Sequence, residues 1–239
     1  MSKILIKDKD IAVPGEVLAE GMDYLPGNGT YRDKEKIRAE RLGLAQIEGR
    51  AIKLILLSGK YLPKRGDTII GKVEQIIMSG WMLDTNSAYS AMLGMKDATS
   101  EFIPKGADLT QYFNFGDYIV CKITNVTSQK LVDVTLRGPG LRKLRNGRII
   151  EVNTNKVPRI IGKKGSMVSM IKQATDCNII VGQNGIIWLQ GKEPEMEFLA
   201  IDAIKKIEEE SHLSGLTDKM KEFLEKATGK KINIVAAGE

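Results

Sequence analysis

The hydrophobic period of the chain changes near residue 148, and this change constrains the fold more than any other feature. Beyond it, alternating and helical patterns predict strand 148–153, helices 157–161 and 166–175, strands 177–182 and 185–191, and helix 193–210. The longer helices carry apolar residues at i, i+3 and i+4, so each has one buried face. The C-terminal part is therefore expected to be a small domain of order β-α-α-β-β-α.

The first two of these helices are joined by the sequence GKKG, in which Gly162 and Gly165 bracket Lys163 and Lys164. A phosphate-binding P-loop requires a glycine where Val157 stands and a hydroxyl where Lys164 stands, and a dinucleotide loop requires a preceding strand. Neither nucleotide loop fits. A G-x-x-G turn between two helices instead matches the KH fold, whose turn clamps the backbone of about four single-stranded nucleotides.

The residue types of the GKKG turn suit a polyanion. The two glycines lack Cβ, so backbone N–H groups can approach phosphate oxygens, and the following helix directs its positive N-terminus to the same place. The two lysines add charge, while Arg159 and Ile161 are expected to line the groove that holds the bases. The alternative is an inert basic turn exposed to solvent.

The position of the positive charge supports a polyanion ligand. The net charge is +6, yet residues 137–172 contain ten basic residues and a single acidic one, Glu151. That segment carries +9, so the rest of the chain carries −3. A solvated surface normally mixes both signs, whereas a segment of one sign is typical of nucleic-acid binding.

Residues 68–136 predict five strands, 68–78, 81–84, 90–93, 117–126 and 131–136, with a long loop over 94–115 before the fourth. Five strands with this spacing are typical of the OB barrel, which often binds oligonucleotides.

The first 62 residues hold short strands between turns, including 24–32, and predict a small β domain with a thin core. Within it, 33–45 fits a helix, a loop or an irregular strand.

These patterns predict an α+β multidomain chain with domains at 1–62, 63–145 and 146–239. A last helix over 217–227, with Thr217 as its cap and Gly229 as its stop, is expected to pack on the third domain.

Composition argues against several classes of protein. The apolar runs are too short to span a bilayer and no secretory signal opens the chain, so we expect a soluble cytoplasmic protein. Cys121 and Cys177 lie in predicted strands, which favours buried thiols over a disulfide or a metal site. The only histidine, His212, follows a helix end, and no metal-ligand or nucleophile motif is present, so we predict no cofactor, no metal and no catalysis.

Several motifs occur in the order found in one family. VPGE (13–16), YLPGNGTY (24–31), GDTIIGKVEQIIMSGWMLD (66–84), VTLRGPGLRKL (134–144) and the G-x-N-G of VGQNG (181–185) resemble the RNA-binding cap subunits of the RNA exosome, the ribosomal RNA processing protein four family. The resemblance covers the chain except for about its last 25 residues, and the complete GKKG resembles archaeal members.

The resemblance implies a small N-terminal β domain, an OB barrel of the ribosomal protein S-one type and a type I KH domain. It also implies that the turn of Gly182, Asn184 and Gly185 packs against the barrel and sets the angle between the domains. From turn chemistry alone, Asn184 and Gly185 form a two-residue hairpin turn that needs positive φ. We expect a structural role for this turn and no RNA contact.

The barrel departs from other S-one-type RNA binders in one respect. They carry base-stacking aromatic residues where this chain has Ser79 and Met82, and Trp81 is shifted by one position, which points it into the core. Candidate RNA contacts on the barrel are Lys96, Lys105 and Lys130, for which a merely solvated surface fits equally well.

The family implies a non-catalytic cap that recruits single-stranded RNA 3′ ends. Three copies would sit on a ring of RNase-PH-like subunits, held through the N-terminal domain, and the ring would perform 3′-to-5′ phosphorolytic degradation and tailing. The alternative is a free-standing RNA-binding protein, such as a translation or RNA-chaperone factor built from the same modules.

Overall fold

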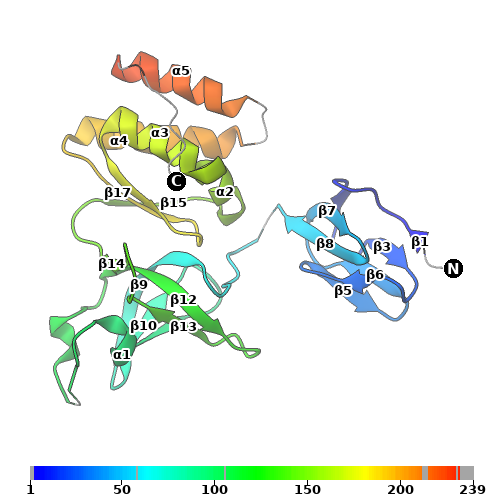
Figure 1. Cartoon of the computed structure of the whole chain (residues 1–239), viewed down its shortest axis with the longest axis horizontal. Helices are drawn as coiled ribbons and strands as arrows, with labels where there is room; N and C mark the ends of the chain where they lie inside the picture. The colour runs from blue at the N-terminus through cyan, green and yellow to red at the C-terminus, as the bar shows by residue number, and fades with distance from the viewer. Residues whose placement is uncertain (1–2, 58, 105, 212–214, 230, 232–239) are drawn as a thin grey trace. The chain divides into compact units, whose positions relative to one another are not determined.

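A computed structural model describes residues 3–57, 59–104, 106–211, 215–229 and 231 (Figure 1). The chain divides into two compact units, Met1–Gly59 and Lys60–Glu239. The second unit contains both the barrel and the helical domain.

The first unit is built from two four-stranded sheets. One has the order β1 (Lys3–Ile4), β3 (Val17–Glu20), β6 (Lys36–Ala39), β5 (Thr30–Asp33), and the other β2 (Ile11–Ala12), β7 (Gly43–Glu48), β8 (Ala51–Leu56), β4 (Leu25–Pro26). Their shared core consists of Ile6, Ala12, Leu18, Ala19, Ile37, Ala39, Ala45, Ile52 and Leu54. The unit thus has a hydrophobic core of its own.

The stretch 33–45, which the sequence left open, forms strands and no helix. It ends β5, forms β6 and opens β7. Lys34 adopts a φ of 54° in the turn between β5 and β6. Ile37 and Ala39 are buried while the alternate residues Lys36 and Arg38 form ion pairs at the surface. Buried and exposed residues therefore alternate here as they do in a strand, and the helical spacing of apolar residues in the sequence does not produce a helix.

The second unit begins with a closed five-stranded barrel. Its strands are β9 (Thr68–Ile77), β10 (Gly80–Asp84), β11 (Ala91–Gly94), β12 (Tyr118–Val126) and β13 (Val132–Thr135). They follow the order β13-β11-β10-β9-β12, and pairing of β12 with β13 closes the barrel. This confirms the predicted OB-like barrel. The long connection between β11 and β12 also contains a short helix, α1 (Met95–Ala98), and a 3-10 turn, Leu109–Gln111.

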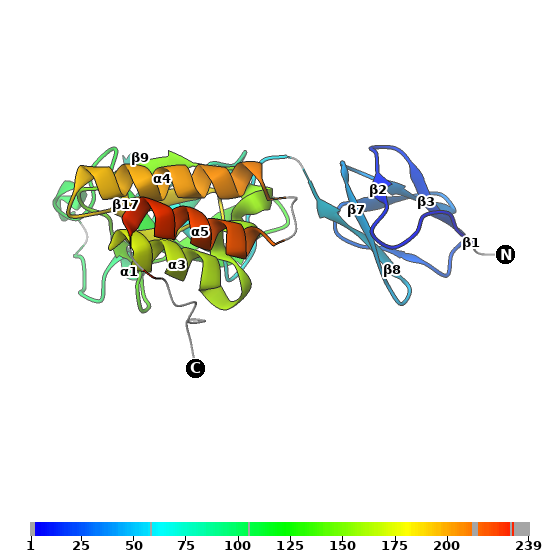
Figure 2. The same cartoon turned by 90° about the horizontal axis from the view of Figure 1, so that it is seen from above.

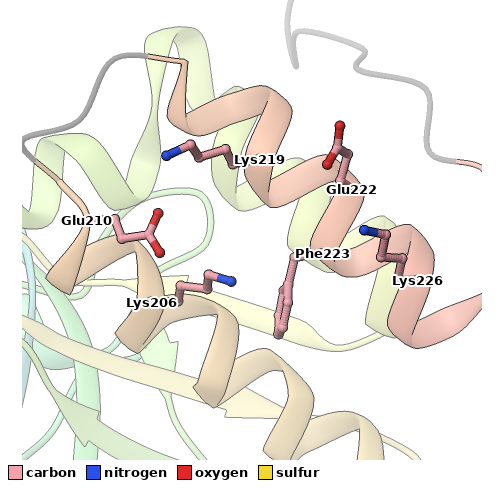
Figure 3. Close-up of a pocket in the computed structure, with 6 residues that line it drawn as sticks. All are labelled: Lys206, Glu210, Lys219, Glu222, Phe223 and Lys226. Carbon is pink, nitrogen blue, oxygen red and sulfur yellow. The ribbon is translucent and has the colours of Figure 1, made fainter.

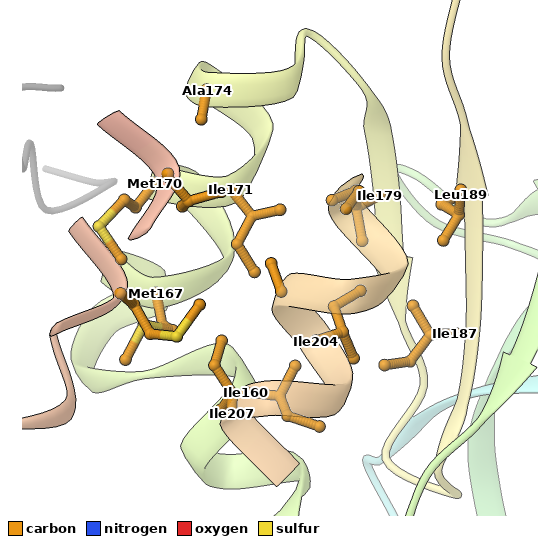
Figure 4. Packing of buried hydrophobic residues seen from close by; sticks show 14 of the residues in the cluster. Ile160, Met167, Met170, Ile171, Ala174, Ile179, Ile187, Leu189, Ile204 and Ile207 are labelled. Carbon is orange, nitrogen blue, oxygen red and sulfur yellow. The ribbon is translucent and has the colours of Figure 1, made fainter. Parts of the chain in front are cut away.

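The rest of the second unit confirms the predicted β-α-α-β-β-α order. The elements in this order are β15 (Arg148–Glu151), α2 (Val157–Ile161), α3 (Ser166–Thr175), β16 (Asn178–Val181), β17 (Ile186–Gln190) and α4 (Pro194–Glu209). The strands form an antiparallel sheet of order β15-β17-β16. Figure 4 shows its core, where Ile171 of α3 and Ile204 of α4 lie toward the strand residues Ile179, Ile187 and Leu189, while Met170 points away from the sheet.

A final helix, α5 (Leu216–Thr228), packs on α3 and α4, and Figure 2 shows these three helices side by side. Figure 3 shows Phe223 of α5 beside Lys206 of α4, whose Nζ lies 4.4 Å from the ring centroid. Gly229 ends α5 with a φ of 67°, as predicted. The predicted cap is wrong: Gly215 precedes the helix with a φ of 70°, and Thr217 lies inside its first turn. Leu216 is buried and therefore belongs to the packed face, which extends the helix by one residue at its start.

The small sheet is covered on both faces. Its helix-facing residues belong to the core just described, while Ile186 and Trp188 form a separate cluster with Ile70, Val120 and Leu144 of the barrel side. Trp188 also donates its Nε1–H to the carbonyl of Asn146, at 2.8 Å. The barrel and the helical domain therefore share an apolar contact within one unit.

Candidate nucleic-acid interface

The GKKG turn joins α2 to α3 and is open to solvent at its lysines. Gly162 and Gly165 both have a φ of 77°, and Lys164 between them has a φ of 52°. A Cβ at Gly162 would lie 2.7 Å from the backbone nitrogen of Met167. Position 162 therefore requires glycine for both backbone conformation and space, whereas position 165 requires it for conformation alone.

The electrostatic character of the turn suits an anion. Helix α3 has ten residues and starts directly after Gly165, with no side-chain cap and no acidic residue in its first turn. Lys163 and Lys164 are exposed and form no ion pair within the described part of the chain. Helix dipole and lysine charge thus act on the same side of the turn, without an internal carboxylate to offset them.

The two residues predicted to line the base groove lie on α2, next to the turn. Arg159 is exposed, and Ile161 is half-buried against the domain core. Ile160 between them is fully buried and fixes the helix, which begins with Pro158 in its first turn as predicted. Arg159 and Ile161 thus lie in the last turn of α2, directly before the GKKG turn, and both side chains are at least partly exposed.

The predicted barrel lysines are not brought together. Lys96 is exposed on α1, beyond the C-terminal end of β11, and Lys130 is exposed in the hairpin before β13, with a φ of 64°. Because β11 and β13 run parallel, with Ala91 opposite Val132, the two lysines lie at opposite ends of this strand pair. Lys105 lies outside the described residues.

Asn184 in the β16–β17 loop is completely buried, and its amide contacts the barrel. Its Oδ1 accepts a hydrogen bond from the Ile70 N–H at 3.2 Å, and its Nδ2 donates to the carbonyls of Ile70 and Thr85 at 2.8 and 2.9 Å. Strand β9 pairs with β10 only from Lys72 onward, so Ile70 lies beyond that pairing. The Asn184 amide both accepts from and donates to the backbone of Ile70, so it takes the place that a peptide group of a neighbouring strand would occupy at this edge of β9.

Main-chain bonds extend this contact. The N–H of Gln183 donates to the Thr68 carbonyl at 2.9 Å, and Nδ2 of Asn86 donates to the carbonyl of Asn184 at 3.3 Å. Sequence reasoning missed Asn86, since no pattern in the sequence links it to a residue almost a hundred positions later. The turn that the resemblance assigned to the barrel thus lies against it in the structure.

The predicted geometry of this turn needs two corrections. The strands are joined by the four residues Gly182–Gly185, closed by a bond from the Gly185 N–H to the Gly182 carbonyl, and not by two residues. Positive φ occurs at Gly185, at 81°, and not at Asn184. Asn184 is therefore needed for its amide. Gly182 is needed for space, because a Cβ there would lie 2.4 Å from Oδ1 of Asn184.

Trp81 confirms the prediction that it points inward. It is completely buried, donates its Nε1–H to the Phe113 carbonyl at 3.0 Å, and meets the Phe113 ring edge to face at 5.1 Å between centroids. Of the two residues in the usual stacking positions, Ser79 is exposed and Met82 is half-buried. This part of the barrel therefore offers no aromatic platform for a base.

The described residues contain little that could perform chemistry. No three or more His, Cys, Asp or Glu side chains among them gather into a possible metal site. Cys121 and Cys177 are buried and free, and burial raises the pKa of the Cys121 thiol to about 12, so it stays protonated at neutral pH. His212 lies outside the described residues. No described helix combines the length and apolar character needed to span a bilayer.

Comparison with known proteins gives consistent matches. Residues 147–195 match a family model described as KH domain, and residues 11–48 match one described as Exosome complex exonuclease RRP4 N-terminal region. The chain is similar to three proteins named Exosome complex component Rrp4. It is 41% identical to that of Methanothermobacter thermautotrophicus, over 95% of this chain and 71% of the relative. Identity is 43% with that of Pyrococcus furiosus (94% and 86%) and 43% with that of Methanothermus fervidus (92% and 97%).

A solved structure supports the same relationship. A crystal structure described as an exosome complex RNA-binding protein matches with a TM-score of 0.64 and 36% sequence identity. The match covers 70% of this chain and 97% of that one.

Proposed function

The chain belongs to the family of exosome complex component Rrp4, and from that premise we propose that it is a non-catalytic, RNA-binding cap subunit of an archaeal-type exosome. In this role it recruits single-stranded RNA 3′ ends to a ring of RNase-PH-like subunits. The ring then degrades RNA from 3′ to 5′ by phosphorolysis, or adds nucleotides in the reverse reaction, and three copies of the cap occupy one ring.

The observation that carries the proposal is the exposed GKKG turn in front of α3. Lys163 and Lys164 are solvent-exposed, and the two glycines keep side chains away from the backbone between the helices. A polynucleotide backbone can therefore approach the turn closely, with phosphate oxygens near N–H groups and lysine ammonium groups. Contacts to the backbone carry little sequence information, so we expect weak sequence preference.

The first unit supports a protein-docking role through an apolar row on its outer surface. Ile11 pairs with Leu44, and Leu44 pairs with Ile55, across β2, β7 and β8. Ile11 is 62% exposed and Ile55 is 50% exposed. Their neighbours Ala12, Ala45 and Leu54 face the core, so strand alternation directs the apolar row outward. Apolar surface on a small domain is typical of a protein interface, and we assign this row to the ring.

The barrel and KH domain support a binding role over a catalytic one. RNA cleavage requires a bound metal or a poised acid and base, and the site built from Arg159, Ile161 and the GKKG turn contains basic and apolar side chains only. Cleavage is therefore assigned to the ring subunits.

The proposal is tested by reconstitution. The purified chain should bind single-stranded RNA and leave it intact, and it should co-elute with the ring subunits in size-exclusion chromatography. Adding the chain to the ring should increase degradation of RNA at low concentration. RNA cleavage by the chain alone would contradict the proposal.

A variant separates the cap from the free-standing alternative. Ile55→Asp should abolish co-elution with the ring, because it places a charge in the exposed apolar row, and should leave RNA binding unchanged. Tyr31→Asp is the matched control, since Tyr31 is 44% exposed on β5 of the other sheet. If the unaltered chain binds RNA and does not co-elute, the free-standing RNA-binding protein is favoured.

A further inference from the structure

The connection between the barrel and the KH domain contains basic residues that the GKKG turn leaves unexplained. Residues 137–148, RGPGLRKLRNGR, include five basic and no acidic residues. They supply half of the ten basic residues in the strongly positive segment of the sequence. A segment that only connected two domains would not need all of its charged residues to be positive, so this charge indicates another role.

This connection is fixed on the barrel. Strand β14 (Arg142–Lys143) pairs with β12, with Lys143 opposite Ile119 and Arg142 opposite Val120. The N–H of Leu144 then donates to the Tyr118 carbonyl at 2.8 Å. The Leu144 side chain is 7% exposed, within the apolar cluster between barrel and KH sheet. The basic side chains therefore project from an anchored backbone.

Internal carboxylates neutralise only some of these cations. Lys143 forms an ion pair with Asp117, and Nε of Arg148 lies 2.8 Å from a carboxylate oxygen of Glu197. Arg145 is exposed and forms no ion pair with any residue that the structure describes. Its guanidinium is available to an external anion.

An exposed aromatic side chain lies at the same edge of the barrel. Phe115 is 72% exposed in the turn Asn114–Asp117, which is closed by a bond from the Asp117 N–H to the Asn114 carbonyl at 3.1 Å. Because Leu144 is opposite Tyr118 in an antiparallel pairing, the next position places Arg145 beside Asp117, the last residue of that turn. The register therefore places Phe115 and Arg145 at the same edge of the barrel, and neither side chain belongs to a core cluster.

We propose that Phe115 and Arg145 form a second contact site for single-stranded RNA, separate from the GKKG turn; this inference rests on the proposed function. A base stacks on the Phe115 ring, and Arg145 contacts an adjacent phosphate. An aromatic face beside an unneutralised guanidinium favours a polynucleotide over an acidic protein surface, because bases and phosphates alternate along the same strand. The barrel thus contacts RNA away from the usual stacking position next to Trp81.

The test compares two labelled RNAs by fluorescence anisotropy with the full chain. A strand of about four nucleotides matches the KH turn alone, and one of about fifteen nucleotides is long enough to reach a second site. Phe115→Ala should weaken binding of the long RNA by about fivefold or more, which is the lower range for loss of one stacked base. Arg145→Ala should flatten the slope of log affinity against log salt by about 0.7. Neither change should affect the short RNA.

Arg50→Ala is the matched charge control, because Arg50 is exposed in the first unit, between β7 and β8. It should leave binding of both RNAs unchanged. A second readout uses Phe115→Trp. The natural tryptophans Trp81 and Trp188 are buried, so the new indole reports the exposed position, and the long RNA should quench its fluorescence while the short RNA should not.

The outcomes distinguish this inference from the proposed function. If Phe115→Ala and Arg145→Ala bind the long RNA as the unaltered chain does, while Lys163→Asp with Lys164→Asp weakens it, the second site is wrong and the proposed function stands. If the unaltered chain binds neither the long nor the short RNA, the second site and the proposed function are both wrong. Polyglutamate could displace the long RNA as effectively as unlabelled RNA does, in a manner that requires Arg145, while Phe115→Ala leaves binding of the long RNA unchanged. In that case the site binds acidic protein and the inference is overturned.

Discussion

Asn184→Ala provides the sharpest test of how the barrel and the KH domain are joined. The substitution removes an amide that makes three buried hydrogen bonds with the backbone of Ile70 and Thr85. It leaves the neighbouring glycines and the loop conformation in place, since Asn184 does not need positive φ.

The expected cost follows from the groups left behind. One N–H and two carbonyls lose their side-chain partner, and each unsatisfied buried polar group costs about 1–3 kcal/mol. Removal of the amide also creates space that water can enter, which offsets part of the loss. We therefore expect a decrease of about 3–4 kcal/mol in the free energy of unfolding, a large part of the roughly 5–15 kcal/mol typical of a domain.

The assay is urea unfolding followed by tryptophan fluorescence, since Trp81 lies in the barrel core and Trp188 in the apolar cluster between barrel and KH sheet. Hydrogen exchange at the Ile70 amide gives a local readout, because that N–H donates directly to Asn184. Its exchange should accelerate in the variant more than exchange at Val73, deeper in the barrel core.

Asn178→Ala is the control, because Asn178 is an exposed asparagine at the start of the edge strand β16. It should change the free energy of unfolding by less than about 0.5 kcal/mol. If Asn184→Ala is within about 1 kcal/mol of this control, the amide does not hold the two domains together and the reasoning is refuted.

Three further predictions concern the turn and the stability of the KH domain. Lys163→Asp with Lys164→Asp should weaken RNA binding and flatten the salt slope by about 1.4 for two lost phosphate contacts, with an unchanged circular dichroism spectrum; an unchanged slope would mean that the turn is not used. Gly162→Ala should lower the melting temperature, because its Cβ would approach Met167 and alanine disfavours a φ of 77°; equal melting would contradict this. The hydrogen bonds from the Gly191 N–H and from Arg148 lower the pKa of Glu197 in the folded state. The ionised Glu197 carboxylate therefore stabilises the fold at pH values above its pKa in the unfolded chain, and this stabilisation is lost as the pH falls through its lower pKa in the folded chain. Glu197→Gln should therefore flatten the acid limb of stability below about pH 4.5, measured by melting at several pH values.

Elements with a clear period were predictable from the sequence. Helix α4 buries Ala200, Ala203, Ile204 and Ile207 at the spacing read from its residues, and Trp81 lies in the core because strand alternation fixes its side. Both signals are local: a period of 3.6 or 2 specifies which side chains are buried.

Features that depend on distant contacts were not predictable. Position 184 resembles an ordinary turn asparagine, and only its contact with Ile70, more than a hundred residues earlier, shows that its amide replaces a strand neighbour. Likewise, Phe115 and Arg145 are 30 positions apart, and the β12–β14 register brings them to one edge. Charge counting alone indicated the basic segment and could not separate its neutralised residues from its available ones.

The partners of Asn184 are peptide groups, and this has a consequence for how the chain tolerates change. A carbonyl or an N–H is the same whichever residue carries it, so replacements at positions 70 and 85 that preserve the barrel leave this polar attachment intact. At position 184, only an amide of this length supplies a donor and an acceptor together. Sensitivity to mutation is therefore concentrated on one side of the junction.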